Sequence, residues 1–380
     1  MQKFVDERGN TIYAHRPPSE LNVYIDTKGS KGAIIYLARE VKFRGLCVIA
    51  LRGENATLFV GNAKLGNTFI QLYQDAVCYI GDDSTMHGSI RPQRLRTAVG
   101  TTLMIGNDCM ISENIEITVS DGHCIYEADS GKNVSLSRSV FIGDHVWLGR
   151  NSSVLKGSRM ASGSILGLGA ILTGKSCEPN TIYAGVPAKM LATGKLWGRE
   201  ALGEEKPTEQ EKCKRMFECD ADAVIRPCDI EYTLNSLATS HEKIAFLYDA
   251  IYCNSAHNRF AWSKETADAR DGRLIPYNNS FEQHVTHRAT VRLNDNDEPL
   301  RCYCAYPGDD SMGMLQLHAL WLKRYAIWWQ HLRCSFMRSI CSGNKKRHYK
   351  EKKAYYRHLL RRIATYKKMM NASLRSGDKR

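Results

Sequence analysis

The sequence predicts a mainly β fold, a parallel β-solenoid with three-sided coils, followed by a C-terminal α-helical region. Six consecutive hexads run without a gap from residue 142 to residue 177, and the first position of each is aliphatic. A strict period of six fits neither the 3.6-residue repeat of a helix nor the alternation of a long strand. Near the C-terminus, apolar residues recur instead at spacings of three and four, which is typical of amphipathic helices.

The hexads define where each side chain lies in a triangular prism. Their first positions, which we expect inside, are Ile142, Leu148, Val154, Met160, Leu166 and Leu172. Their fifth positions are small or β-branched and are expected near the corners: Val146, Ser152, Ser158, Ser164, Ala170 and Ser176. Glycine supplies turn conformations that residues with a Cβ resist. Three hexads close one coil, so this stretch predicts two complete coils.

The solenoid is expected to begin well before these hexads. Residues 1–20 read as an irregular lead-in, whereas residues 21–92 contain short aliphatic runs separated by Gly, Asn and Asp, which predict strands of irregular first coils. The period of six returns at Val99, Ile105, Ile111 and Ile117. We therefore assign residues 21–197 to one β-solenoid domain.

A long insertion interrupts the repeat between Ile117 and Ile142. Its polar, glycine-containing part, residues 121–137, is too long for one coil and predicts a loop ejected from the prism. Repeats stack best without interruption, so such a loop is expected to serve a function.

The remainder of the chain has a different character. Residues 198–312 are expected to form a linker with short helices, with helical character from Leu234 to Phe260. Residues 313–380 are expected to form basic, aromatic, amphipathic helices. The tryptophans of this last segment either pack a helical core or form an exposed patch: Trp321, Trp328 and Trp329.

The net charge of +13 is concentrated at the end of the chain, where residues 341–380 hold fourteen Lys and Arg against Glu351 and Asp378. This excess suits an anionic polymer or the inner membrane surface, although a solvated helix face explains it equally well. No nucleic-acid-binding module is recognisable, so nucleic acid is not an expected partner.

Cysteine usage and the N-terminus predict a cytoplasmic protein. The thirteen Cys include no CxxC pair, which argues against a structural zinc site and a disulfide scaffold. The N-terminus lacks the apolar core of a signal peptide, and no stretch of about 20 apolar residues occurs.

His123, at the start of the ejected loop, is the first candidate for chemistry because an imidazole accepts a proton near neutral pH. Asp121 and His145 are candidates for orienting groups. Trp147, in the first hexad after the loop, either anchors the loop by packing or forms a hydrophobic wall for an elongated ligand.

These residues resemble the left-handed β-helix acyltransferases with hexapeptide repeats, in the branch that acetylates sugars, xenobiotics and capsular polysaccharides. The resemblance covers roughly Val99 to Trp197 and rests on IGNDCMIS, the DGH of the loop, IGDHVWLGRNSSVLKG, GSILGLGAILT and EPNTIYAGVPAK. It implies acetyl-CoA as acyl donor, no metal, and a homotrimer with active sites between neighbouring prisms. It also implies that His123 is the general base and that Trp147 lines the channel for donor and acceptor.

The resemblance further implies a binding surface for CoA. Small residues would let the pantetheine arm approach the backbone, and two lysines would face the phosphates. The implied residues are Gly149, Ser164, Gly167, Gly169, Lys175, Gly185 and Lys189. Two departures from the family pattern are Leu168, where Ala is usual, and Val186 in the GVPAK motif. About 180 residues after the prism have no counterpart in compact members.

The expected function is O-acetylation of a sugar hydroxyl on a bacterial surface glycan, such as capsular polysaccharide or lipooligosaccharide. One alternative is N-acetylation of an amino-sugar nucleotide or another small amine. Another is a non-catalytic trimeric scaffold that docks through its C-terminal helices. A γ-type carbonic anhydrase uses the same prism but needs three histidines, and the two coils after Trp147 contain none.

Overall fold

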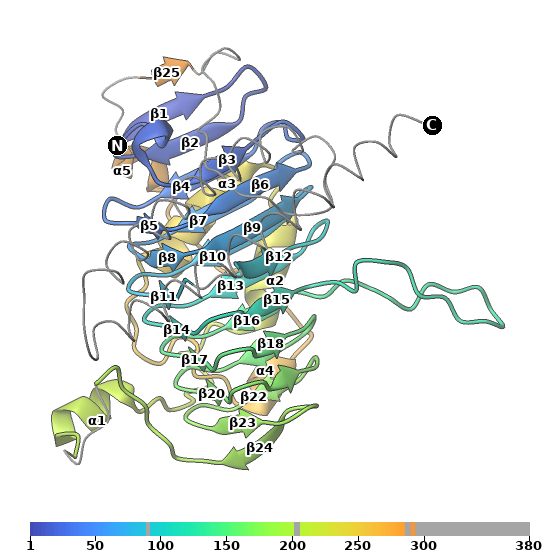
Figure 1. Ribbon diagram of the computed structural model, residues 1–380, viewed down its shortest axis with the longest axis vertical. Helices are drawn as coiled ribbons and strands as arrows, with labels where there is room; N and C mark the ends of the chain where they lie inside the picture. Colours follow the sequence, from blue (N-terminus) through green and yellow to red (C-terminus); the bar gives the residue numbers. More distant parts are fainter. Residues whose placement is uncertain (89–91, 201–205, 286–289, 293–380) are drawn as a thin grey trace, which may run out of the picture. The chain divides into compact units, whose positions relative to one another are not determined.

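The computed structural model describes residues 1–88, 92–200, 206–285 and 290–292. Its main body is a prism with one sheet along each of three sides, and the chain passes from sheet to sheet at each corner (Figure 1). Each strand pairs in parallel with strands from the neighbouring coils, as β17 does with β14 and β20. The triangular solenoid predicted from the hexads is therefore confirmed.

The three sheets, named A, B and C, have these strands among the described residues. Sheet A contains β1 (Gln2–Val5), β2 (Thr11–Ala14), β4 (Ile34–Leu37), β7 (Thr57–Val60), β10 (Val77–Ile80), β13 (Thr102–Ile105), β16 (Val140–Ile142), β19 (Arg159–Met160), β22 (Ser176–Cys177) and β25 (Thr290–Arg292). Sheet B contains β3 (Tyr24–Asp26), β6 (Val48–Arg52), β9 (Thr68–Tyr73), β12 (Gln93–Arg96), β15 (Glu116–Thr118), β18 (Ser153–Val154) and β21 (Ile171–Leu172). Sheet C contains β5 (Lys42–Arg44), β8 (Lys64–Gly66), β11 (Thr85–Met86), β14 (Met110–Ile111), β17 (Trp147–Leu148), β20 (Ile165–Leu166), β23 (Ile182–Ala184) and β24 (Lys189–Ala192).

The interior of the prism follows the predicted period, with one exception. All six first-position aliphatic residues of the hexads are fully buried, as are Ile105, Ile111 and Ile117. Val99 is 63% exposed, so its assignment to the interior was wrong. It lies in the turn between β12 and β13, where Leu95 and Leu103 supply the buried side chains instead.

The N-terminal segment also differs from the irregular lead-in that we expected. Strands β1 and β2 form an antiparallel hairpin at the end of sheet A, and β25 pairs with the outer side of β1. Buried side chains such as Phe4 and Ile12 bring this hairpin into the core of the prism.

A ladder of polar side chains stabilises the corner between sheets A and C, the A–C corner. At successive coils, a side-chain oxygen accepts a hydrogen bond from the backbone N–H of the preceding coil. Asp82 accepts from Asn62 at 2.6 Å, Asn107 from Asp82 at 3.0 Å, Asp144 from Asn107 at 2.6 Å, and Ser162 from Asp144 at 3.0 Å. The Asn and Asp residues of this corner are thus explained by coil stacking.

Helices cover the outer face of sheet A (Figure 1). We call residues 217–285 the cap. Its elements are α2 (Pro227–Ser236), α3 (Ser240–Phe246), the π-helix Leu247–Tyr252, α4 (Lys264–Asp268) and α5 (Phe281–His284). Outward-facing aromatic residues of the sheet, such as Tyr36 and Phe59, pack with cap residues such as Phe246 and Phe281 in a second hydrophobic core. Sheet A is therefore buried on both faces.

Polar contacts attach the cap along the length of the prism. Arg259, 1% exposed, forms a two-bond ion pair with Asp144 of the A–C corner, at 2.8 and 3.0 Å. Buried Lys243 of α3 donates to the Asp75 backbone carbonyl at 3.2 Å. The Ser176 hydroxyl donates to Asp268 at 2.5 Å. The cap thus contacts coils from the start of the prism to near its end.

Two segments lie outside the prism and the cap. A short 3₁₀ helix, Pro18–Glu20, precedes β3, and α1 (Glu209–Arg215) precedes the cap. The chain also divides into two compact units, of which the second, Tyr303–Arg380, lies outside the described residues together with the helices expected there. Within the described part of the chain, no helix is long and apolar enough to cross a membrane.

Candidate active site

The ejected loop is present where the sequence predicts it. The chain leaves the prism after β15 and returns at β16, and the loop between them projects far from the body of the molecule (Figure 1). Its two arms are joined by backbone hydrogen bonds, including one from Val134 to Ile125 at 2.8 Å. Every residue from 121 to 137 except Ser135 is exposed.

His123 lies at the base of this loop. Its exposed ring makes no hydrogen bond to any residue that the structure describes. Asp121, the proposed orienting group, is held instead by an ion pair with Lys156 on the corner between sheets B and A. This pair fixes the start of the loop against the prism.

Trp147 lies on a different side of the prism. It opens β17 in sheet C, whereas the loop emerges between sheets B and A. Its indole is half-buried, and Nε1 donates to the Ser112 hydroxyl at 3.3 Å. One chain therefore does not bring His123 and Trp147 to the same face.

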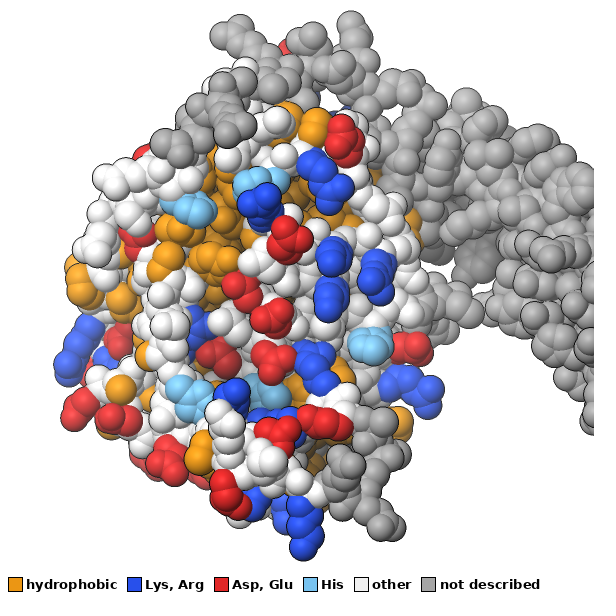
Figure 2. Space-filling view, turned by 90° about the vertical axis from the view of Figure 1, so that its left-hand side faces the viewer, with side chains coloured by type: hydrophobic (Ala, Val, Ile, Leu, Met, Phe, Trp, Pro, Cys, Tyr) orange, Lys and Arg blue, Asp and Glu red, His pale blue; other side chains and the backbone are white. Residues whose placement is uncertain are grey.

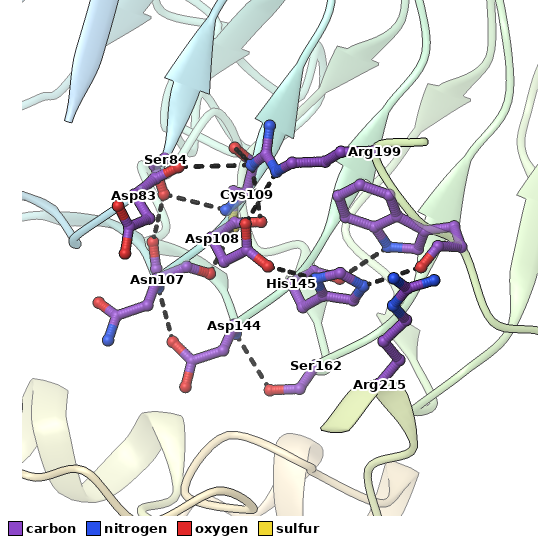
Figure 3. Close-up of polar contacts among 12 residues, drawn as sticks. Asp83, Ser84, Asn107, Asp108, Cys109, Asp144, His145, Ser162, Arg199 and Arg215 are labelled. Atoms are coloured by element: carbon purple, nitrogen blue, oxygen red, sulfur yellow. Dashed lines mark hydrogen bonds and ion pairs between the residues drawn. The ribbon is translucent and has the colours of Figure 1, made fainter. Parts of the chain in front are cut away.

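His145 is tied into the A–C corner (Figure 3). Its Nδ1 lies 2.7 Å from a carboxylate oxygen of Asp108, and its Nε2 lies 3.1 Å from the backbone carbonyl of Trp197. The imidazole also stacks on the Trp197 indole, with ring centroids 4.0 Å apart. His145 thus contacts groups at the A–C corner, whereas Asp121 pairs with Lys156 at the corner between sheets B and A.

The residues expected around CoA are divided among four places. Gly149, Gly167, Gly169 and Gly185 follow sheet C strands of successive coils and form a column at the corner between sheets C and B. A Cβ on Gly149 would lie 2.7 Å from the backbone nitrogen of Leu168, so close coil stacking already requires this glycine. Leu168, beside the column, is 68% exposed.

The other three expected CoA residues do not lie in this column. Ser164 is fully buried, and its hydroxyl donates to the Ala161 carbonyl at 2.7 Å. Exposed Lys175 lies at the corner between sheets B and A, the corner from which the loop departs. Exposed Lys189 begins β24. An elongated ligand would have to cross sheet B to reach both the glycine column and Lys175.

Charged side chains are prominent on the side of the molecule that carries the sheet C strands. Acidic side chains gather in the middle of this surface, with Lys and Arg beside them (Figure 2). Arg199 lies here: its Nε donates to Asp108 at 2.9 Å, and its terminal nitrogens reach Thr85 at 2.8 Å and Cys109 at 3.1 Å.

A cavity of about 220 Å³ lies behind His145, between the A–C corner and the chain segments that pack on it. Lys214, Phe217 and His257 line its outer side. The carboxylates that line it, Asp108 and Asp144, are already paired. No group of three or more His, Cys, Asp or Glu among the described residues could hold a metal ion.

Asp108, Trp197 and Arg199 were missed in the sequence, although one signal was available for Asp108. IGNDCM and IGDHVW occupy the same place in successive coils, because Met110 pairs with Trp147. Aligning these hexads places Asp108 beside His145. Trp197 and Arg199 lie beyond the repeats, so no period predicts their position.

The Asp108→Asn substitution is expected to change how stability depends on pH. Burial raises the pKa of this carboxyl, but hydrogen bonding to His145 and the charge of Arg199 outweigh that effect, so the pKa lies below its ordinary value. At pH values between the pKa in the folded state and the higher pKa in the unfolded state, the unfolded chain binds more protons than the folded chain. The free energy of unfolding therefore rises with pH in this range. The contribution is present above about pH 4 and is lost as pH falls through the folded pKa.

Urea unfolding at a series of acidic pH values measures this effect. The difference in midpoint between wild type and Asp108→Asn should be largest at neutral pH and shrink on acidification. Asp222→Asn, at an exposed carboxylate with no ion-pair partner among the described residues, is the control. A difference that is constant with pH would refute the assignment.

Comparison with known proteins identifies relatives of part of this chain. The chain is 33% identical over 153 residues to a polysialic acid O-acetyltransferase of Neisseria meningitidis, covering 40% of this chain and 69% of that protein. It is 34% identical over 95 residues to a polysialic acid O-acetyltransferase of Escherichia coli O1:K1, covering 25% of this chain and 31% of that protein. The crystal structure of a polysialic acid O-acetyltransferase aligns with a TM-score of 0.44 at 26% identity, covering 54% of this chain and 94% of that one. No family model matches.

Proposed function

We propose that this protein transfers an acetyl group from acetyl-CoA to a hydroxyl of an anionic bacterial surface glycan. The premise is that the chain belongs to the left-handed β-helix family of sugar O-acetyltransferases. The observation that carries this proposal is the 33% identity over 69% of a polysialic acid O-acetyltransferase. The exposed imidazole at the base of the projecting loop, which makes no hydrogen bond within the described part of the chain, supports it.

In the proposed reaction, His123 accepts the proton of the acceptor hydroxyl while the hydroxyl oxygen attacks the thioester carbonyl carbon. Backbone N–H groups would stabilise the oxyanion of the tetrahedral intermediate. The carbon–sulfur bond then breaks, and the leaving thiolate takes the proton from the imidazolium. The products are an acetyl ester on the sugar and free CoA.

The active site is proposed to form between two copies of the chain within a homotrimer. His123 and Trp147 lie on different sides of one prism, so a shared site requires a neighbouring copy to supply one of them. The loop also carries four apolar side chains that are each at least 44% exposed: Ile125, Tyr126, Val134 and Leu136. A second copy would cover these side chains.

The donor is proposed to lie along the glycine column between sheets C and B. Exposed Leu168 beside the column is proposed to contact the pantetheine arm, and exposed Lys189 is proposed to face a phosphate. The basic residues 341–380 are proposed to bring the enzyme to its anionic acceptor or to the inner membrane surface.

An acceptor panel tests the proposed activity. Purified protein is incubated with acetyl-CoA and, separately, polysialic acid, a neutral polysaccharide and an amino-sugar nucleotide, while thiol release is followed. Thiol release with polysialic acid and new O-acetyl signals in its NMR spectrum are expected. Acetylation of only the amino-sugar nucleotide, or of none of the three, would contradict the proposal.

Mixed trimers test the composite site. Co-expression of His123→Ala and Trp147→Ala chains should restore activity, because about one quarter of randomly assembled sites would combine an intact histidine with an intact tryptophan. Each variant expressed alone is the control and should remain nearly inactive. Absence of restored turnover in trimers shown to contain both chains would rule out a site shared in this way.

A further inference from the structure

Four side chains form a connected cluster at the A–C corner, two coil residues and two residues that follow the last coil. We call Asp108, His145, Trp197 and Arg199 the corner clamp. His145 and Asp108 belong to successive coils, and Asp108 contacts both His145 and Arg199 (Figure 3). Trp197 contacts His145.

His145 and Trp197 are joined by two reciprocal hydrogen bonds. The His145 ring faces the Trp197 carbonyl at 3.1 Å, and the Trp197 indole N–H donates to the His145 carbonyl at 2.9 Å. Their rings stack at an interplanar angle of 9°. Both ring nitrogens of His145 face hydrogen-bond acceptors, the Asp108 carboxylate and this carbonyl.

The backbone at His145 has the positive φ that the equivalent corner residues of the two preceding coils, Asp83 and Asp108, also have. His145 has a φ of 52°, in the left-handed region that residues with a Cβ adopt at a cost of about 1 kcal/mol. Trp147 follows two residues later. The hydrogen bond from Trp197 to the His145 carbonyl therefore fixes the peptide from which β17 and Trp147 continue.

Trp197 also touches the Trp147 side chain. The two ring centroids lie 6.1 Å apart at an angle of 45°, within the range of favourable aromatic pairs. Trp197 is only 5% exposed, whereas Trp147 is half-buried. Trp197 thus forms a wall behind Trp147, and Ser112 holds the indole N–H of Trp147 at 3.3 Å. Ligands can reach Trp147, while Trp197 is shielded from them.

We propose that the corner clamp, through Trp197, positions the Trp147 indole for acetyl transfer. The inference rests on the proposed function, because it takes Trp147 to line the channel for donor and acceptor. Trp197 and His145 then act as positioning residues. They touch neither substrate and affect turnover through the orientation of Trp147.

Trp197→Phe keeps an aromatic ring against His145 but removes the indole N–H. Trp262→Phe is the matched control: Trp262 is a fully buried cap residue whose Nε1 donates to the Ile225 carbonyl at 2.6 Å. Both substitutions remove one N–H···O=C bond from a buried indole. Only the first removes it next to Trp147.

Fluorine NMR of the full chain containing 5-fluorotryptophan tests the inference without requiring activity. The Trp147 resonance, assigned from the spectrum of Trp147→Phe, should shift or broaden in Trp197→Phe and stay unchanged in Trp262→Phe. An unchanged Trp147 resonance in Trp197→Phe would overturn the proposal. The NMR measurement still decides whether Trp197 positions Trp147 if no acetyl transfer is found. Absence of acetyl transfer would contradict the proposed function and not the contact between the two tryptophans.

Kinetics provides the second readout. Trp197→Phe should lower kcat about tenfold, since misplacing a group by a fraction of an ångström is costly, and should change the KM for acetyl-CoA little. The same substitution in a Trp147→Phe background should have almost no further effect, because the group it positions is already gone. Equal losses of kcat in both backgrounds, or a loss no larger than in Trp262→Phe, would show that Trp197 does not act through Trp147.

Discussion

Replacing His123 with alanine is expected to lower kcat for acetyl transfer by about 10²–10⁴-fold, the usual contribution of a general base. The exposed ring makes no hydrogen bond to described residues, so its removal should leave stability within about 0.5 kcal/mol. The lost turnover therefore reports chemistry rather than folding. Thiol release at saturating acetyl-CoA measures the effect.

His15→Ala serves as the control for this substitution, because His15 is an exposed histidine far from the loop in sequence. This variant should turn over like the wild type. Light scattering and CoA titration should show that His123→Ala keeps its assembly and donor binding. Wild-type turnover in His123→Ala would remove His123 from the mechanism.

Arg259→Met is expected to cause the largest loss of stability, about 3–5 kcal/mol. Arg259 neutralises Asp144, whose side chain is only 12% exposed, and also donates to the backbone carbonyls of Ile251 and Asn254. Methionine fills much of the volume but leaves the carboxylate without its counter-charge. The midpoint of urea unfolding should fall accordingly.

Two further variants separate the buried charge from the volume change. Adding Asp144→Asn to Arg259→Met should restore part of the stability, because asparagine keeps the oxygen that accepts from the Asn107 backbone at 2.6 Å. Arg39→Met disrupts an exposed pair with Glu40 and should cost at most about 1 kcal/mol. A double variant no more stable than Arg259→Met would show that the unpaired charge is not the cause.

The prism was predictable because its period is carried by single side chains. Each buried first-position residue, from Ile142 to Leu172, repeats one local geometry, so the pattern can be recognised without knowledge of the rest of the chain. Corners are less constrained, since any residue with a suitable turn conformation fits there. That freedom explains why Val99 was wrongly placed inside.

The cap was missed, although sheet A carried a sign of it. Strands such as β4 and β10 are buried on both faces, and their sequences IIYL and VCYI are continuously apolar. Sheet B strands such as β9 alternate between buried residues and half-buried or exposed ones instead. Uninterrupted apolar strands indicate a sheet covered on both sides. Which segment covers it depends on contacts between residues distant in sequence, such as Asp144 and Arg259.

The candidate site was predictable only in its parts. The break in the repeat located the loop and His123, because an insertion stands out against a regular period. The sequence could not show that Trp147 lies on another side of the prism, since that depends on which sheet each hexad joins. It also could not show that His145 contacts Trp197, because no repeat relates the two residues.

The attachment of the cap along sheet A has a consequence for how the prism unfolds. A bare solenoid holds together only between adjacent repeats and can fray from either end. Here the cap contacts coils near both ends, from Tyr13 to Ser176, and therefore links repeats that do not touch each other. Loss of a terminal coil also breaks contacts that hold the middle of the prism, which favours a single cooperative transition over progressive loss of coils.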